Sequence, residues 1–340
     1  MSSRRASGER ELGWALIGCG GAGRGHARGA AGAAGVTVRT FYDAVPGKAD
    51  EYAREFGGAA TTDTEQIFGD AAIDIVSIAT PHNAHTELAI AAFAAGKHVY
   101  LEKPMAMTTD ECLQIAEAQR AAGTQLMINY SFRFSGAVRV AKQRIGPPIV
   151  SHAQCLMARA DLGLWRWDPT VGGGPMWDVG IHAVDLLCWF YGAPPVEVSA
   201  TGGRVSHPDE LAGTDILDTI AATLRFGDGS VATLLISDAD FNAFVSKWFF
   251  EIYGRGESAV IYDHCRAVAF SRPGGDRTVE TLSPPPVDRF PFLLDAIRDG
   301  GDSYVPAATG IIATTVVESI IASVHTGRTQ TVELPAEVAR

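Results

Sequence analysis

A glycine-rich turn near the start of the chain constrains the fold more than any other feature of the sequence. It directly follows the apolar run of residues 14–17 and matches the pattern G-x-G-x-x-G in the residues Gly18, Cys19, Gly20, Gly21, Ala22 and Gly23. In this pattern the first glycine permits a tight turn, the second lets the backbone approach a pyrophosphate, and the third allows close contact between helix and strand. Many glycine-rich turns bind nothing, but a turn between a predicted strand and a predicted helix favours a dinucleotide-binding βαβ unit.

An acidic residue extends this pattern. Residues 36–42 are β-branched or aromatic and predict a second strand, which ends on Asp43, twenty residues after Gly23. A carboxylate at that place can accept hydrogen bonds from both hydroxyls of an adenosine ribose, and it would repel a 2′-phosphate. Since no arginine follows it immediately, the sequence predicts NAD as the cofactor and disfavours NADP.

The first 130 residues alternate strand and helix patterns, and the later residues are mostly strands. Strands are predicted at 73–79, 98–101 and 125–129, with a helix from 46 to 56, another before Gly96, and a third from Thr108 to Gly123. After residue 130 we predict strands at 149–158, 196–204, 216–226, 230–237, 247–254, 258–263 and 266–271, and helices at 179–190, 288–299 and 308–326.

Alternating strands and helices are typical of a parallel, doubly wound sheet, whereas consecutive strands with alternating burial suit an antiparallel sheet. We therefore predict an α/β chain with an N-terminal Rossmann sheet and a C-terminal α+β domain that holds a large, mostly antiparallel open sheet. The expected limits are a disordered leader at 1–10, the dinucleotide-binding domain at 11–130, and a substrate-binding and oligomerisation domain at 131–335.

Composition narrows the expected partners and the compartment. The chain carries 28 basic and 39 acidic side chains, a net charge of −11, and nucleic-acid phosphates favour basic patches instead. No stretch approaches the roughly 20 apolar residues that a membrane helix needs. The five cysteines are odd in number, scattered and without a CxxC pair, which predicts neither a disulfide framework nor a zinc knuckle and suits the cytoplasm.

Lys103 follows the predicted strand 98–101, in the sequence Glu102-Lys103-Pro104. Taken alone, it reads as a solvated surface lysine. Ligands of a doubly wound sheet bind beyond the carboxyl ends of its strands, however, so this lysine is expected at the cofactor cleft. An ammonium near a nicotinamide can hold a substrate hydroxyl and stabilise developing alkoxide charge.

A second group of polar residues lies after the run Gly172-Gly173-Gly174. Asp178, His182 and Asp185 stand at i, i+4 and i+7, on one face of the predicted helix. A histidine there is often a satisfied interior group, but its usual pKa also suits proton exchange with a carbinol. We expect Asp178 to orient it or to bind a substrate hydroxyl, and Asp185 to be a structural partner. A divalent metal on this spacing is the less favoured alternative, so the sequence predicts no metal.

Two further groups are candidates at the cleft. His82 and His85 follow the strand at 73–79, where they can pack on a cofactor or bind zinc. Trp165 and Arg166 lie in a loop, where they can stack on and hydrogen-bond a polyol or simply hold the loop in place.

Taken together, these segments resemble the glucose–fructose oxidoreductase and inositol dehydrogenase family, called Gfo/Idh/MocA, over nearly the whole chain. The resemblance is carried by residues 15–26, 79–85, 96–104, 172–185 and the late helix that ends at Gly327. The combination of Glu-Lys-Pro with Asp-x-x-x-His, in that order, is its most specific part. At His82 many relatives carry asparagine, which puts that one contact in doubt.

The resemblance implies an NAD(H)-dependent oxidoreductase that moves a hydride between nicotinamide and a carbinol or carbonyl of a sugar, inositol or related polyol, and that forms a homo-oligomer, a dimer or a tetramer. Lys103 matches the family's catalytic lysine, and Asp178 and His182 match its substrate-side acid and histidine, with His182 as base in oxidation and acid in reduction. The nicotinamide ribose would be lined by Thr80, Pro81, His85 and Glu102.

Two other functions compete with this one. A non-catalytic regulator can use the same fold to sense a dinucleotide or a sugar, although retention of Lys103, Asp178 and His182 argues against it. A metal-dependent hydrolase or isomerase is the third reading.

Overall fold

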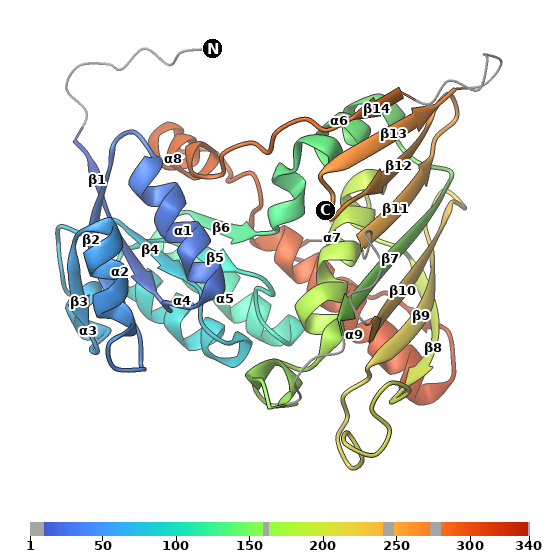
Figure 1. Ribbon diagram of the computed structural model, residues 1–340, viewed down its shortest axis with the longest axis horizontal. Helices are drawn as coiled ribbons and strands as arrows, with labels where there is room; N and C mark the ends of the chain where they lie inside the picture. The colour runs from blue at the N-terminus through green and yellow to red at the C-terminus, as the bar shows by residue number, and fades with distance from the viewer. Residues whose placement is uncertain (1–9, 159–162, 241–247, 273–279, 339–340) are drawn as a thin grey trace.

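The computed structural model describes residues 10–158, 163–240, 248–272 and 280–338, which form two β-sheets with helices between and around them (Figure 1). The predicted leader at 1–10 therefore lies outside the described residues except for Arg10, which pairs with Asp74. The predicted domain limits at 11–130 and 131–335 stay predictions.

The first sheet has six parallel strands in the order β3-β2-β1-β4-β5-β6. Its strands are β1 (Leu12–Ile17), β2 (Val36–Tyr42), β3 (Ala59–Thr61), β4 (Ile75–Ile78), β5 (His98–Glu102) and β6 (Leu126–Asn129). The order reverses between β1 and β4, which places the switch point of a doubly wound sheet beside the glycine-rich turn. All four residues of β4 are buried, as a central parallel strand requires. The predicted Rossmann sheet is confirmed.

Helices connect these strands, namely α1 (Gly21–Gly32), α2 (Lys48–Phe56), α3 (Glu65–Phe68), α4 (His85–Ala94) and α5 (Thr109–Ala122). The small residues of α1 let it lie close to the sheet, with Ala27 and Ala30 fully buried. Helix α5 begins with the predicted capping box, in which Thr108 and Glu111 exchange hydrogen bonds with each other's backbone. The short β3 and α3 were not predicted, because neither is long enough to show a periodic pattern.

The second sheet has nine strands in the order β14-β13-β12-β11-β7-β10-β9-β8-β15. Its strands are β7 (Val150–Ala158), β8 (Glu197–Gly203), β9 (Thr219–Arg225), β10 (Val231–Asp240), β11 (Trp248–Tyr253), β12 (Ser258–Tyr262), β13 (Ala267–Ser271), β14 (Glu280–Leu282) and β15 (Gln330–Thr331). Every recorded pairing is antiparallel except that of β10 with β7. The predicted mostly antiparallel sheet is confirmed.

Helices α6 (Gly136–Ile145), α7 (Ile181–Tyr191) and α9 (Ala307–Thr326) lie along the side of this sheet that is turned toward the first sheet, and α8 (Phe290–Asp299) lies beside α1 (Figure 1). The sequence did not predict α6, which starts with Ser135 accepting from the amide of Val138. The predicted helix 179–190 begins instead with a π-helical turn, Met176–Gly180, and becomes α-helical at Ile181.

One helix corrects the expectation about apolar stretches. Helix α9 is long and apolar enough to cross a membrane by length and composition alone. It nevertheless contacts β8, α5 and α7, and 56% of its most apolar window is buried inside the protein. Helix α9 is a core helix that connects the two sheets.

Candidate active site

The glycine-rich turn forms an open concave surface at the start of α1. Gly18 has φ +101°, and a Cβ there would lie 2.4 Å from the carbonyl oxygen of Ala79. A Cβ on Gly23 would lie 2.2 Å from the oxygen of Gly18, whereas on Gly20 or Gly21 it would meet nothing within 4 Å. The first turn of α1 has no acidic residue and no side-chain cap, so its amides stay available to an anion. This surface fits the pyrophosphate of a dinucleotide.

Asp43 lies beyond the end of β2, beside that turn. One carboxylate oxygen accepts the amide of Cys19 at 2.8 Å and the other accepts the amide of Val45 at 2.8 Å. These backbone donors fix the carboxylate, and each oxygen keeps a second lone pair with which to accept a ribose hydroxyl. The geometry fits the predicted role of Asp43 toward an adenosine ribose.

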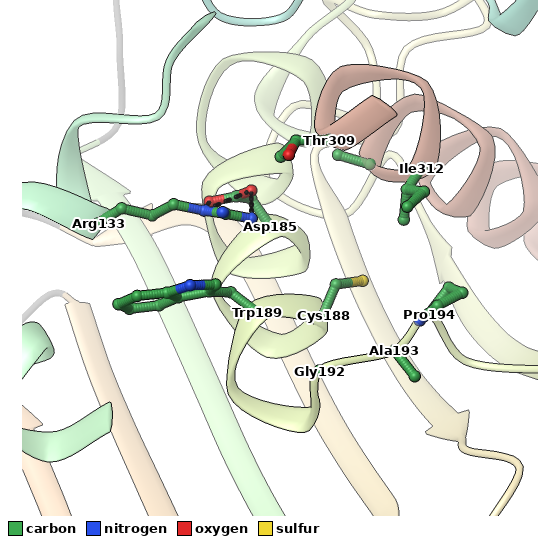
Figure 2. Close-up of a pocket in the computed structure, with 10 residues that line it drawn as sticks. Arg133, Asp185, Cys188, Trp189, Gly192, Ala193, Pro194, Thr309 and Ile312 are labelled. Atoms are coloured by element: carbon green, nitrogen blue, oxygen red, sulfur yellow. Dashed lines mark hydrogen bonds and ion pairs between the residues drawn. The ribbon is translucent and has the colours of Figure 1, made fainter. Parts of the chain in front are cut away.

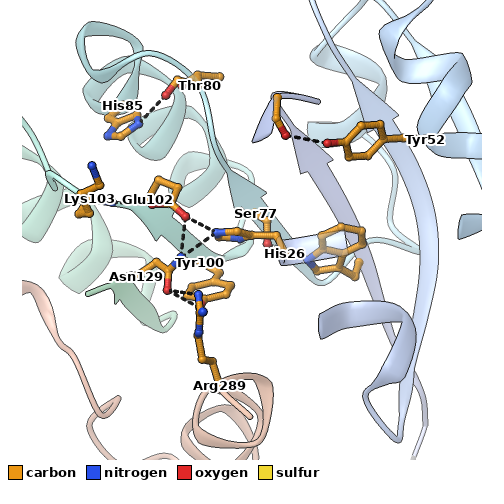
Figure 3. A network of polar contacts seen from close by, with 12 residues as sticks. His26, Tyr52, Ser77, Thr80, His85, Tyr100, Glu102, Lys103, Asn129 and Arg289 are labelled. Atoms are coloured by element: carbon orange, nitrogen blue, oxygen red, sulfur yellow. Dashed lines mark hydrogen bonds and ion pairs between the residues drawn. The ribbon is translucent and has the colours of Figure 1, made fainter. Parts of the chain in front are cut away.

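A buried polar network lies behind the end of β5 (Figure 3). Glu102 accepts from Nε2 of His26, 2.9 Å away on α1, and from the amide side chain of Asn129 on β6. Tyr100 and Arg289 each donate to Oδ1 of Asn129 at 2.9 Å. Burial favours the neutral acid, but His26, Lys103 and Asn129 outweigh burial and lower the pKa of Glu102 to about 2. Glu102 is therefore a fixed anion directly before Lys103.

Lys103 and Asp178 meet although 75 residues separate them in the chain. Nζ of Lys103 donates to Oδ1 of Asp178 at 2.9 Å and to the main-chain oxygen of the same residue at 2.6 Å. The two side chains are 14% and 15% exposed, so the pair is mostly buried but still in contact with solvent. Burial would raise the pKa of Asp178, but Lys103 and Arg166 together lower it to about 2. Asp178 is therefore an anion at neutral pH.

His182 lies on the first turn of α7, next to this pair. Burial, followed by the charge of Lys103, lowers the pKa of its ring to about 3, so the ring is neutral at physiological pH. Its Nδ1 is buried without a partner among the described residues, and Nε2 makes no hydrogen bond with them. Phe132 packs edge-on against the imidazole, with the ring centroids 4.9 Å apart. A ring fixed by packing while its nitrogens lack partners is suited to a ligand.

The segment that follows β4 contains Thr80, Pro81, His82 and His85. Nδ1 and Nε2 of His85 lie 2.7 Å and 3.1 Å from the carbonyl oxygens of Pro104 and Thr80. Nδ1 of His82 donates to the carbonyl of Gly172 at 3.0 Å, and burial lowers the pKa of this ring to about 3. Both histidines thus use ring nitrogens on backbone carbonyls, which explains them without zinc. The hydroxyl of Thr80 is buried and has no partner among the described residues, and Pro81 is exposed.

Trp165 and Arg166 belong to the short 3-10 turn Trp165–Trp167. Nη1 of Arg166 lies 3.4 Å from Oδ2 of Asp178, so Asp178 stands between two cations. Trp165 packs edge-on against His82 at 4.8 Å and remains 37% exposed. The structure therefore brings both loop residues to the predicted centre.

Asp185 faces away from that centre. It accepts three hydrogen bonds from Nε and Nη2 of Arg133, at 2.7 to 3.1 Å, and both side chains are buried (Figure 2). The expectation that Asp185 is a structural partner agrees with this contact. The expected common face assumes an unbroken 3.6-residue period, and the π-helical turn Met176–Gly180, which contains Asp178, departs from that period. Asp178 and Asp185 pair with different cations, Lys103 and Arg133. Within the described part of the chain, no group of three or more His, Cys, Asp or Glu side chains could hold a metal ion.

Two family models match the chain, a Rossmann-fold NAD-binding oxidoreductase model over residues 12–130 and a GFO/IDH/MocA C-terminal domain model over residues 138–260. The chain belongs to the Gfo/Idh/MocA family. As a member of that family it is an NAD-binding oxidoreductase, and both the predicted family and the predicted cofactor are confirmed.

Individual members of the Gfo/Idh/MocA family match most of the chain. The 1,5-anhydro-D-fructose reductase of Ensifer adhaerens is 31% identical over 87% of this chain and 90% of its own length. The inositol 2-dehydrogenase 2 of Saccharopolyspora erythraea is 29% identical over 95% of this chain and 96% of its own length. Among solved structures, aldose-aldose oxidoreductase of Caulobacter crescentus complexed with glycerol has a TM-score of 0.84 at 25% identity, covering 95% of this chain and all of that one. A levoglucosan dehydrogenase complexed with NADH shares the fold, with a TM-score of 0.87 at 24% identity over 95% of this chain and all of that one.

Four residues of this Gfo/Idh/MocA site carried no predicted role, namely His26, Tyr100, Asn129 and Arg289. For His26 a signal exists in the sequence, because it falls with Gly23, Ala27 and Ala30 on the one buried face of α1. Asn129 ends a strand, where ligands bind, but the side chain alone does not identify its partner. Arg289 reaches the network from a segment 160 residues farther along the chain, which no local pattern could reveal.

Proposed function

We propose that this chain transfers a hydride between NAD and a carbinol or carbonyl of a sugar, inositol or related polyol, with His182 as general acid and base and Lys103 stabilising the alkoxide. The observation that carries the proposal is the ion pair of Lys103 and Asp178 at the carboxyl end of β5, together with a neutral His182 that has no hydrogen-bond partner among the described residues. The bound nicotinamide supplies the hydride acceptor or donor. The names of the relatives support the substrate class.

The residues of the chain would share the work as follows. The ammonium of Lys103, held by two oxygens of Asp178, has a third donor with which to bind the reacting oxygen. In oxidation the neutral ring of His182 takes the hydroxyl proton, and in reduction it returns that proton to the new hydroxyl. Asp178, Arg166 and Trp165 border the same space, where they can accept from, donate to and stack on a polyol. Thr80, His85 and Glu102 lie on the cofactor side.

Asp43 supports a preference for NAD over NADP, because a fixed carboxylate beside the adenosine ribose repels a 2′-phosphate. A homo-oligomer, dimer or tetramer, and a cytoplasmic location remain predictions. Light scattering after size-exclusion chromatography measures the oligomeric state. The cytoplasmic location is consistent with five cysteines that are all free and buried.

The test is a screen of absorbance at 340 nm with NAD and NADP in parallel against sugars, inositols and keto-inositols. We expect turnover with the unsubstituted chain and with His152→Ala, a partly exposed histidine on β7 that bonds Thr233. Lys103→Ala and His182→Ala should each lower turnover by roughly a hundredfold or more, while NADH binding, followed by fluorescence, persists. Turnover near the parent level in both variants would refute the assignment. Tight NADH binding without turnover on any compound would favour a dinucleotide- or sugar-sensing regulator.

A further inference from the structure

An arginine near the active site lacks an ionic partner. Arg289 immediately precedes α8, is partly buried, and donates from Nη1 to Oδ1 of Asn129 at 2.9 Å (Figure 3). It forms no ion pair with any residue that the structure describes, whereas Arg133 and Arg144 both pair with carboxylates. Withdrawing a guanidinium from water costs free energy unless an anion compensates it. In a chain of net charge −11, a partly buried arginine without a carboxylate indicates a place for an external anion.

Arg289 forms one wall of a cavity of about 390 Å³. The other walls are the segments 131–136, 264–266 and 283–286. The polar side chains that line this cavity are basic or hydroxyl-bearing, and none of its lining residues is an aspartate or a glutamate. Three successive residues with positive φ, Asp263, His264 and Cys265, form one rim, and such backbone is costly for residues other than glycine. The cavity is thus suited to negative charge and large enough for a small organic ligand.

The two carboxylates that directly adjoin cavity-lining residues in the sequence, Asp263 before His264 and Asp288 before Arg289, are engaged elsewhere. Asp263 pairs with Arg266 at 2.8 Å, on the exposed side of the turn. Oδ1 of Asp288 accepts the amide of Phe290 at 3.2 Å, and Asp288 lines the neighbouring cavity beside His26 and not this one. Arg289 therefore lines the cavity without a direct ion pair among the described residues. Asn129 separates it from Glu102, the buried anion of the same network.

The cavity adjoins the reacting centre. Phe132 is one of its walls, and the same ring packs against the imidazole of His182 with centroids 4.9 Å apart. The positive charge of Arg289 is among the charges that lower the pKa of His182, after burial and Lys103. A ligand in the cavity would lie one aromatic ring away from the proposed acid and base.

We propose that this cavity binds an oxyanion, a carboxylate or a phosphate, through the guanidinium of Arg289. The remaining guanidinium nitrogens can donate two parallel hydrogen bonds to such a group, which lysine cannot do. The proximity of His182 favours an anion carried by the substrate itself, so the substrate class becomes an acidic sugar or a sugar phosphate. That last step rests on the proposed function. A free inorganic anion has the same chemistry and is distinguished by experiment.

Isothermal titration of the NADH-loaded protein tests this binding without requiring turnover. The probes are D-glucuronate and D-glucose 6-phosphate, with D-glucose as their neutral counterpart and inorganic phosphate as the free anion. We expect a charged probe to bind roughly tenfold or more tightly than D-glucose, and Arg289→Gln to remove that difference. Arg289→Lys should restore only part of it, and Arg225→Gln, an exposed arginine with the same change in charge, should keep it.

Each outcome decides a point. If D-glucuronate or D-glucose 6-phosphate binds more tightly than both D-glucose and phosphate, the anion belongs to the substrate. If phosphate alone shows the dependence on Arg289, the cavity holds a free anion. Equal binding of charged and neutral probes, or tight binding of anions to Arg289→Gln that still binds NADH, would overturn the inference. Failure of the screen at 340 nm with intact anion binding would instead refute the proposed function alone.

Discussion

One helical segment carries two aspartates that look alike in the sequence, Asp178 and Asp185, but their ion pairs differ in the structure. Asp178 precedes α7 and Asp185 lies within it, seven residues apart, and each accepts from a cation brought from another element. The pair of Lys103 and Asp178 is 14% and 15% exposed, whereas the pair of Arg133 and Asp185 is 9% and 1% exposed. The first pair can exchange its partners for a ligand. The second is more deeply buried and holds three hydrogen bonds, so it serves the fold, although both of its residues line a pocket of about 200 Å³ (Figure 2).

The bonding capacity of the two cations explains this difference. Nζ of Lys103 spends two donors on Asp178 and retains one. Arg133 donates from Nε and Nη2 to the same carboxylate, and this two-point contact holds both groups in place. The comparison teaches that the chemistry of a paired acid is decided by the exposure of the pair and by the donors left over.

The largest expected effect comes from breaking the buried pair of Arg133 and Asp185. Arg133→Ala leaves Asp185 buried without a counter-charge, so the free energy of unfolding should fall by about 3–5 kcal/mol. Chemical denaturation measures this. The double variant Arg133→Met/Asp185→Leu should recover a large part of the loss, because no isolated charge remains. A loss below about 1 kcal/mol for Arg133→Ala would contradict the structural role.

Breaking the pair of Lys103 and Asp178 should lower turnover and leave the free energy of unfolding nearly unchanged. Lys103→Ala should lower kcat by roughly 10²–10³, or about 3–4 kcal/mol, through the loss of alkoxide stabilisation. Its free energy of unfolding should change by no more than about 1 kcal/mol, since the pair is partly solvated. Steady-state kinetics on the substrate from the screen and denaturation curves provide both values. A large loss of stability with little loss of kcat would make the two pairs equivalent.

Lowering the pH should destabilise the protein through His182, which lies beside the pair of Lys103 and Asp178. Its folded pKa of about 3 lies below the unfolded value of about 6.5, so between these values the unfolded chain binds the extra proton and stability falls as the pH falls. This one group should cost about 2 kcal/mol at pH 5 relative to pH 8. His182→Asn should therefore lose about that much less stability than the parent over the same interval, as measured by denaturation at both pH values. The prediction fails if parent and variant lose the same amount.

The smallest expected effect concerns a third carboxylate, one held by amides instead of cations. Asp43→Asn removes the charge but keeps an oxygen that can accept the amide of Cys19. The ratio of kcat/KM for NAD over NADP should fall by about tenfold, near 1.4 kcal/mol, because repulsion of the 2′-phosphate disappears. Kinetics with both cofactors check this. An unchanged ratio would mean that Asp43 is only a structural acceptor.

The sequence predicted the parts of this molecule that depend on local pattern. The strand and helix order of the first sheet follows from apolar runs and from the cap at Thr108, and the turn at 18–23 follows from glycine spacing. The paired role of Lys103 and Asp178 could be expected only from the family resemblance. Spacing alone placed Lys103 at a strand end and could not measure its distance from Asp178.

The features that could not be predicted from the sequence depend mostly on contacts between distant segments. The π-helical turn before α7 was not predicted, because a helical wheel assumes an unbroken 3.6-residue period. The network behind β5 joins α1, β5, β6 and the residue before α8, and four of its five members had no assigned role. No membrane-length apolar stretch was expected from the sequence, yet α9 is long and apolar enough for one, and its contacts with β8, α5 and α7 show that it is a core helix.

The burial of the five cysteines has a consequence for handling the protein. Burial raises the pKa of each thiol, to about 12 for Cys19, Cys112 and Cys188, so the reactive thiolate is almost absent from the folded chain. Alkylating reagents and mild oxidants should therefore find no target in the native protein. Unfolding exposes five thiols at once, and the rate of thiol labelling becomes a direct count of open molecules that needs no engineered probe.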